Sequence, residues 1–158
     1  MVQQVCSHWA FFPLGIVSRM DKMATATMNT LNISAIIAGI VAWIVVVTIF
    51  DRCMRLAWPE YAAALPTMAF TLAMMFARLT EGAITTIAAG FINRLIVRTP
   101  LWPAAVQGLI MLLLFLPEHY KLWHSFPVWY HLTFLGYLIP LTVLGAALAP
   151  KRRIKAPA

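Results

Sequence analysis

Charged side chains are scarce in this sequence. Only 11% of the 158 residues are Asp, Glu, Lys or Arg, whereas 62% are hydrophobic. A soluble domain carries about 25% charged residues, so this chain lacks the polar side chains needed to cover a core in water. The deficit argues against a soluble globular domain and indicates lipid as the solvent. The length suits one compact bundle of helices.

Motifs for chemistry are also missing. The two cysteines, Cys6 and Cys53, form no CxxC pair. Neither an HExxH metal motif nor a glycine-rich phosphate-binding loop occurs in the sequence. We therefore expect a protein that is not an enzyme and that carries no cofactor.

Acidic residues are fewer than basic ones, with five Asp and Glu against 12 Lys and Arg, for a net charge of +7. A nucleic-acid-binding domain needs its basic residues on a folded polar face, and none is visible, so we expect no nucleic-acid partner. Four basic residues instead follow the last apolar run: Lys151, Arg152, Arg153 and Lys155. We expect this tail, residues 151–158, to bind anionic membrane lipids, which attract each basic residue by about 1 kcal/mol.

Long apolar runs predict an all-α integral membrane protein built as a bundle of four transmembrane helices. A span needs about 20 apolar residues to cross about 30 Å of hydrocarbon. The predicted spans are residues 33–50, 66–97, 101–116 and 126–149. Pro66 fits the first turn of the second span, Pro117 ends the third, and Ser125 is the candidate N-cap of the fourth.

The first 30 residues resemble no stable element, because Pro13 and Gly15 interrupt their short apolar patch. They are predicted to be a disordered or interfacial tail, or an extension that precedes a true start at Met28. In either case the membrane domain is predicted to comprise residues 31–150.

Basic residues are unevenly divided between the two sides that four spans define. One side holds eight of them: Arg19, Lys22, Arg94, Arg98, Lys151, Arg152, Arg153 and Lys155. The other side holds three: Arg52, Arg55 and Lys121. Since cytoplasmic flanks are enriched in Lys and Arg, both termini are predicted to face the cytoplasm. We expect a multi-pass protein of the plasma membrane, which is the inner membrane if the source is bacterial.

A ridge of small and charged residues runs along the second span. It comprises Arg78, Gly82, Thr86, Gly90 and Arg94, which recur every four residues and so share one helix face. Glycines at this spacing let another helix approach closely. Arg78 is therefore expected to point toward a neighbouring helix, and Glu81, three residues on, lies within reach of an ion pair with it.

Two hypotheses follow for this ridge. In the first, the Arg78–Glu81 pair pins the second helix in a protein that packs with itself, as a homo-oligomer, or within a larger membrane complex. Gln107, Thr133, Tyr137 or a neighbouring subunit would then satisfy the other guanidinium donors. In the alternative, the chain is a small transporter or an ion-conducting subunit in which Glu81 titrates, although an adjacent arginine would hold its carboxylate ionised.

Residues 117–131 gather Glu118, His119, His124 and His131 among tyrosines and tryptophans. The spacings between these histidines match no metal-ligand motif. We interpret the stretch as an aromatic belt at the membrane interface. A metal or haem site formed by these four residues is a further alternative for the function.

Overall fold

The computed structural model describes residues 12–97 and 101–150, with side chains from residue 28 onward. Within these ranges every regular element is a helix, and no strand occurs. The long helices are α1 (Phe12–Ala57), α3 (Leu72–Ile96), α4 (Trp102–Lys121) and α5 (Val128–Leu148), and the short α2 (Pro59–Ala64) links α1 to α3. The all-α prediction is confirmed.

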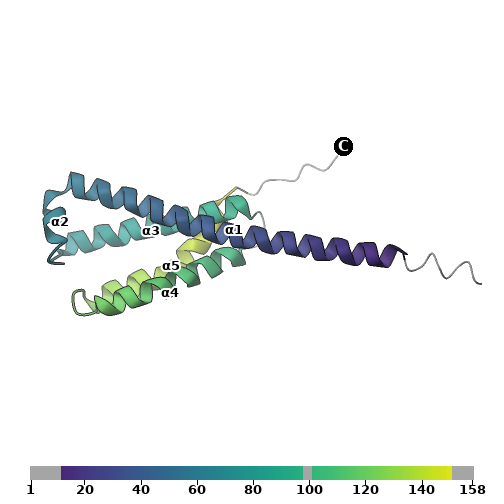
Figure 1. The fold of residues 1–158 in the computed structure, drawn as a ribbon. Helices are drawn as coiled ribbons and strands as arrows, with labels where there is room; N and C mark the ends of the chain where they lie inside the picture. Colours follow the sequence, from purple (N-terminus) through teal and green to yellow (C-terminus); the bar gives the residue numbers. More distant parts are fainter. Residues whose placement is uncertain (1–11, 98–100, 151–158) are drawn as a thin grey trace, which may run out of the picture.

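Helix α1 is much longer than the predicted span 33–50. Its 46 residues correspond to about 69 Å at about 1.5 Å per residue, more than twice the hydrocarbon thickness. Figure 1 shows its N-terminal part extending past the other helices. From Phe12 onward this helix contradicts the disordered alternative for residues 1–30, whereas the interfacial tail and the true start at Met28 stay predictions. Pro13 lies in the first helical turn, where its missing N–H breaks no helical hydrogen bond. Residues 1–11, like the basic tail, lie outside the described residues.

The second predicted helix begins later than expected. After α2 the chain turns, and Met68 has a φ of 53°, which a right-handed helix cannot contain. The Thr71 hydroxyl accepts a hydrogen bond from the Met74 N–H at 3.4 Å and so caps α3. Pro66 therefore lies in the turn and does not start the helix.

The boundaries around the α4–α5 loop also differ from the predictions. Helix α4 continues through Pro117 to Lys121, because proline removes a single backbone hydrogen bond and the following turn buries His119. Helix α5 begins after Pro127, so the expected cap Ser125 is not its N-cap. The Ser125 N–H instead donates to the Leu122 carbonyl at 2.9 Å in the loop.

Three helical segments are long and apolar enough to cross a membrane: Met28–Ala57, Leu72–Ile96 and Val128–Leu148. Helix α4 does not meet this standard, since polar residues occupy its last turn. Apolar side chains on α1 such as Ile33, Ile37 and Ile44 are more than half exposed, which suits contact with lipid. The prediction of four spans is thus supported for three of them.

Glycines allow α3 and α5 to touch through their backbones. A Cβ atom at Gly90 of α3 would collide with the Thr142 carbonyl of α5. A Cβ atom at Gly145 of α5 would likewise collide with the Ile87 carbonyl of α3. Away from these contacts α3 and the α4–α5 pair diverge toward α2 (Figure 1).

We predict that Gly90→Ala destabilises the protein by roughly 1–3 kcal/mol, the usual cost of overpacking a close contact. Gly136→Ala is the matched control on α5, because nothing lies within 4 Å of a Cβ at that position. The control should be neutral or slightly stabilising, since alanine favours helix over glycine. Denaturant titration in detergent micelles, followed by circular dichroism, measures both variants. Equal unfolding midpoints for the two would contradict the backbone contact.

Candidate functional site: a polar cavity among four helices

A cavity of about 180 Å³ lies between α1, α3, α4 and α5. Its lining combines charged and imidazole side chains with aromatic and aliphatic ones: Trp43, Val47, Arg78, Glu81, Gly82, Phe115, Glu118, His119, Leu122, Phe126, Tyr130, His131 and Phe134. From the sequence, the charges of the second span and the histidine cluster were two separate features. The structure brings them into one cavity at the α2 end of the bundle.

Phenol oxygens from two other helices hold Arg78. Its Nη1 donates to the Tyr61 hydroxyl of α2 at 2.8 Å, and its Nε donates to the Tyr130 hydroxyl of α5 at 3.4 Å. The guanidinium carbon also lies 5.1 Å from the Phe70 ring centroid, a cation–π distance. The expected ion pair with Glu81 is absent among the described side chains, because the long arginine reaches α2 and α5 instead.

A stack of aromatic rings fixes these phenols in place. Tyr61 is fully buried, with its ring 5.6 Å from that of Phe70. Phe70 stacks on Phe126 at 5.7 Å, and Phe126 stacks on Tyr130 at 4.8 Å. Burial raises the pKa of the Tyr61 phenol, while Arg78 acts in the opposite direction. A neutral phenol accepts a hydrogen bond from the guanidinium without cancelling its charge, so Arg78 keeps its positive charge beside the cavity.

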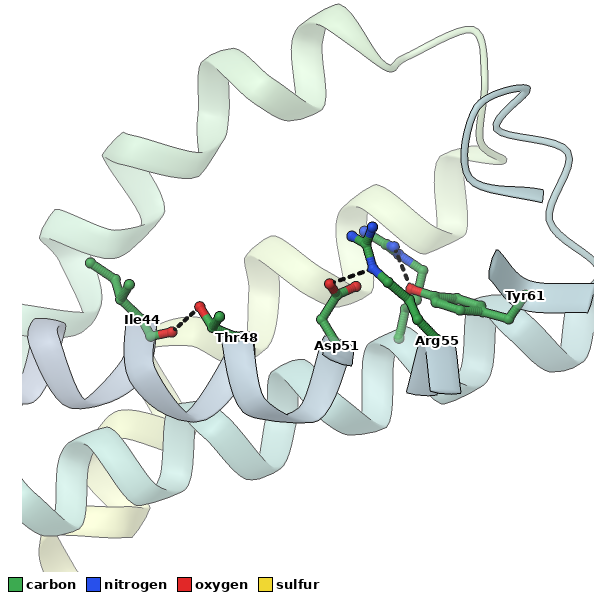
Figure 2. Close-up of polar contacts among 6 residues, drawn as sticks. Ile44, Thr48, Asp51, Arg55 and Tyr61 are labelled. Carbon is green, nitrogen blue, oxygen red and sulfur yellow. Dashed lines mark hydrogen bonds and ion pairs between the residues drawn. The ribbon is translucent and has the colours of Figure 1, made fainter. Parts of the chain in front are cut away.

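Polar groups of α1 near this site are paired with one another. Arg55 forms an ion pair with Asp51 at 2.7 Å, and the Thr48 hydroxyl donates to the Ile44 carbonyl at 2.7 Å. Figure 2 shows these pairs along α1, with Tyr61 on the neighbouring α2. Arg55 is thereby engaged with Asp51, and it forms no ion pair with Glu81.

Glu81 has an unsatisfied carboxylate oxygen. The residue is only 7% exposed, and its Oε1 is buried without a hydrogen-bond partner in the described part of the chain. Leaving a buried acceptor unpaired costs about 1–3 kcal/mol, and more for a charged group. Glu81 also lines the cavity, so an unpaired carboxylate oxygen belongs to one of its lining residues.

His119 and His131 form a close pair, with their Nδ1 atoms 2.7 Å apart. One Nδ1 must donate and the other accept, so at least one of the two rings is neutral. Trp123 stacks on His131 with ring centroids 5.0 Å apart. His131 is fully buried, and its Nε2 has no partner among the described residues. The pair thus contains a second buried polar atom without a partner, on a residue that lines the cavity.

The structure gives a metal site no geometric support. His124 is exposed and does not line the cavity, and Glu118 pairs with Lys121 at 2.9 Å. Within residues 12–97 and 101–150 there is no group of three or more His, Cys, Asp or Glu that could hold a metal ion. Only His119 and His131, of the three histidines considered, come together.

The glycine ridge of α3 packs inside the chain. A Cβ at Gly82 would collide with the Tyr137 hydroxyl of α5, and Gly90 lies against α5 as described above. The Thr86 hydroxyl accepts a hydrogen bond from the Trp43 indole of α1 at 3.2 Å. The ridge thus contacts α5 and α1 of the same chain. That arrangement removes the main argument for a seam between two copies.

Some polar and aromatic partners were not predicted from the sequence. Tyr61 and Phe70, which hold Arg78, carry no sequence signal, because single aromatic residues near a membrane interface are common. Gln107 was an expected partner of Arg78, but its Oε1 instead accepts from Asn93 Nδ2 at 2.8 Å. Both of these amides are buried. The sequence signal for this pair is that Asn93 and Gln107 are each a polar residue within an otherwise apolar segment, where such residues hydrogen-bond across helices.

The chain matches no known protein-family model, and no curated protein and no solved structure matches it. The described residues belong to the class of all-helical proteins, and three of their helices are compatible with membrane spanning. The function of the chain must therefore be argued from the geometry of the cavity.

We predict that Tyr61→Phe destabilises the protein by roughly 1–3 kcal/mol, because it leaves a partly buried guanidinium donor without its acceptor. Tyr120→Phe is the matched control, since Tyr120 is 82% exposed, and it should change the free energy of unfolding by less than about 0.5 kcal/mol. Denaturant titration of both variants in the same detergent provides the comparison. A loss in Tyr120→Phe as large as that in Tyr61→Phe would contradict the role assigned to the buried phenol.

Proposed function

We propose that this chain is a non-enzymatic, multi-pass membrane protein that binds a small polar molecule in the cavity between its helices, as a small transporter does. In this proposal α4 joins the three apolar segments as a fourth span, and both termini face the cytoplasm. The α2 end of the bundle, where the cavity lies, then faces the opposite side.

The observation that carries the proposal is the set of unsatisfied polar atoms in the cavity wall. Glu81 Oε1 and His131 Nε2 are both buried and unpartnered in the described chain. Two such atoms in one apolar environment carry a large energetic cost, which an incoming ligand with complementary groups would offset. Ligand pockets typically combine apolar walls with a few converging polar groups in this way.

Binding in the cavity is favoured over a purely structural role for the same residues. A structural pin would satisfy Arg78 and Glu81 through each other, whereas the structure holds Arg78 on phenols and leaves Glu81 open. Gly82 and Gly90 pack against α5 of the same chain, so these two glycines are not free to form a seam with a second copy. The transporter hypothesis therefore has the stronger support from the geometry.

A cysteine introduced at position 47 tests whether the cavity is accessible to water. The natural Cys6 and Cys53 are first replaced by serine, and Val47→Cys is compared with Val45→Cys. Val47 lines the cavity, whereas Val45 lies two residues away and is 51% exposed on the apolar outside. A membrane-impermeant, charged thiosulfonate reagent added to intact cells should label the Val47→Cys variant at least tenfold faster than the Val45→Cys variant. Equal rates would contradict a water-accessible cavity.

Reporter fusions test the proposed orientation. Green fluorescent protein fused after Ala158 should fluoresce, since it folds on the cytoplasmic side, and alkaline phosphatase at the same position should be inactive. The basis is the excess of Lys and Arg on the side of the termini. Alkaline phosphatase placed in the α4–α5 loop, after His124, should be active. The reverse pattern would overturn the orientation.

A further inference from the structure

The geometry points to a specific class of ligand: we propose that the cavity binds a small, net-neutral zwitterion with an apolar side chain, of the α-amino acid type. Its carboxylate would lie on Arg78 and its ammonium on Glu81. This inference rests on the proposed function and names the chemistry of the molecule that the cavity accepts.

Two of the three charged side chains in the lining, Arg78 and Glu81, are opposite in sign and form no ion pair with each other, whereas the third, Glu118, is paired with Lys121. Arg78 uses N–H groups of Nη1 and Nε on two phenols, and its Nη2 has no acceptor within the described chain. Glu81 Oε1 has no donor among the same residues. The site therefore offers free donors on a cation and a free acceptor on an anion.

The spacing of these charges suits a molecule whose own charges are close together. Residues three apart on a helix have Cβ atoms about 5–6 Å apart, so Arg78 and Glu81 start from neighbouring positions on α3, and both line the cavity. In an α-amino acid the carboxylate and the ammonium are bonded to the same carbon atom. Such a ligand can meet both charges at once, with its carboxylate accepting charge-assisted hydrogen bonds from the free N–H groups of Arg78 Nη2.

Much of the remaining lining is apolar, and the volume of the cavity limits the size of the ligand. Its apolar lining residues include Trp43, Val47, Phe115 and Phe134. The cavity volume of about 180 Å³ is far more than one water molecule needs but less than the roughly 300–1,000 Å³ of pockets for drug-sized ligands. An aliphatic side chain such as that of leucine fits these limits.

A ligand with a single charge would be poorly accommodated. A simple carboxylate on Arg78 would bring a second negative charge next to Glu81, and a simple amine on Glu81 would bring a second positive charge next to Arg78. Like charges placed together in a site of low dielectric are strongly unfavourable. The cavity thus selects for a molecule that carries both charges.

Isothermal titration of the full-length protein in detergent at pH 7 tests the inference. The probes are leucine, 3-methylbutylamine and 4-methylpentanoate, which share one branched side chain and differ only in their charged groups. Leucine should bind saturably and at least tenfold more tightly than either of the other two. The inference is overturned if the amine or the carboxylate binds as tightly as leucine, or if leucine does not bind.

Charge-removing variants provide a second readout. In Glu81→Gln, leucine should lose at least tenfold in affinity, and 4-methylpentanoate should become the preferred probe. In Arg78→Gln, 3-methylbutylamine should become the preferred probe. Glu60→Gln, an exposed position of α2, is the control and should leave all three affinities unchanged. If the Arg78→Gln variant does not fold, the Glu81→Gln variant alone tests the inference. A Glu81→Gln protein that still binds leucine more tightly than 4-methylpentanoate overturns it.

Failure of this inference is distinguishable from failure of the proposed function. If the amine or the carboxylate binds tightly, the cavity is a ligand site and only the zwitterion is wrong. If no probe binds but the Val47→Cys variant is rapidly labelled, the proposed ligand class is wrong, whereas the proposal of a water-accessible cavity is still supported. If no probe binds and the Val47→Cys variant is labelled no faster than the Val45→Cys variant, both proposals are wrong.

Discussion

The backbone contact between α3 and α5 is the constraint on which the rest of the structure depends. At Gly90 and Gly145 the two helices approach until no Cβ atom fits between them. Helices that touch at one level and cross must separate at another, so the bundle widens toward α2. Bulky side chains, including Phe126, Tyr130 and Phe134, occupy the widened part. The cavity is the space that these rings leave unfilled.

The choice of partners for Arg78 determines what this space can do. A buried arginine bonded to a carboxylate would form a closed, neutral pair with little left to offer a ligand. Tyr61 and Tyr130 instead satisfy part of the guanidinium without neutralising it, and Glu81 stays unpaired. Under the proposed function the polar groups are already positioned for a ligand, which lowers the cost of ordering them upon binding. The neighbouring His119–His131 pair adds an imidazole nitrogen to the same wall.

The sequence predicts the parts of this arrangement that depend on local pattern. Low charge and long apolar runs predict an all-helical chain, and four-residue spacing places Gly82 and Gly90 on a packing face of α3. The length of α1 and the start of α3 were missed, because Pro13 is tolerated in a first helical turn and the turn at Met68 has no glycine to mark it. The partners of Arg78 were missed for a different reason. Tyr61 and Tyr130 lie 17 and 52 residues away in the chain, and local spacing carries no information about such tertiary contacts.

The distribution of polar groups along the bundle favours a binding site over a conducting pore. Below the cavity, the hydroxyls of Thr85 and Thr86 donate to carbonyls of their own helix, so they do not form a chain of donors. The next buried polar pair on α3, Asn93 with Gln107, lies beyond the level at which Gly90 touches α5. Conduction needs a continuous path of water or polar groups, and the backbone contact interrupts it. Under the proposed transporter function, the glycine contact between α3 and α5 is one level at which these helices would have to separate if a molecule passed between them.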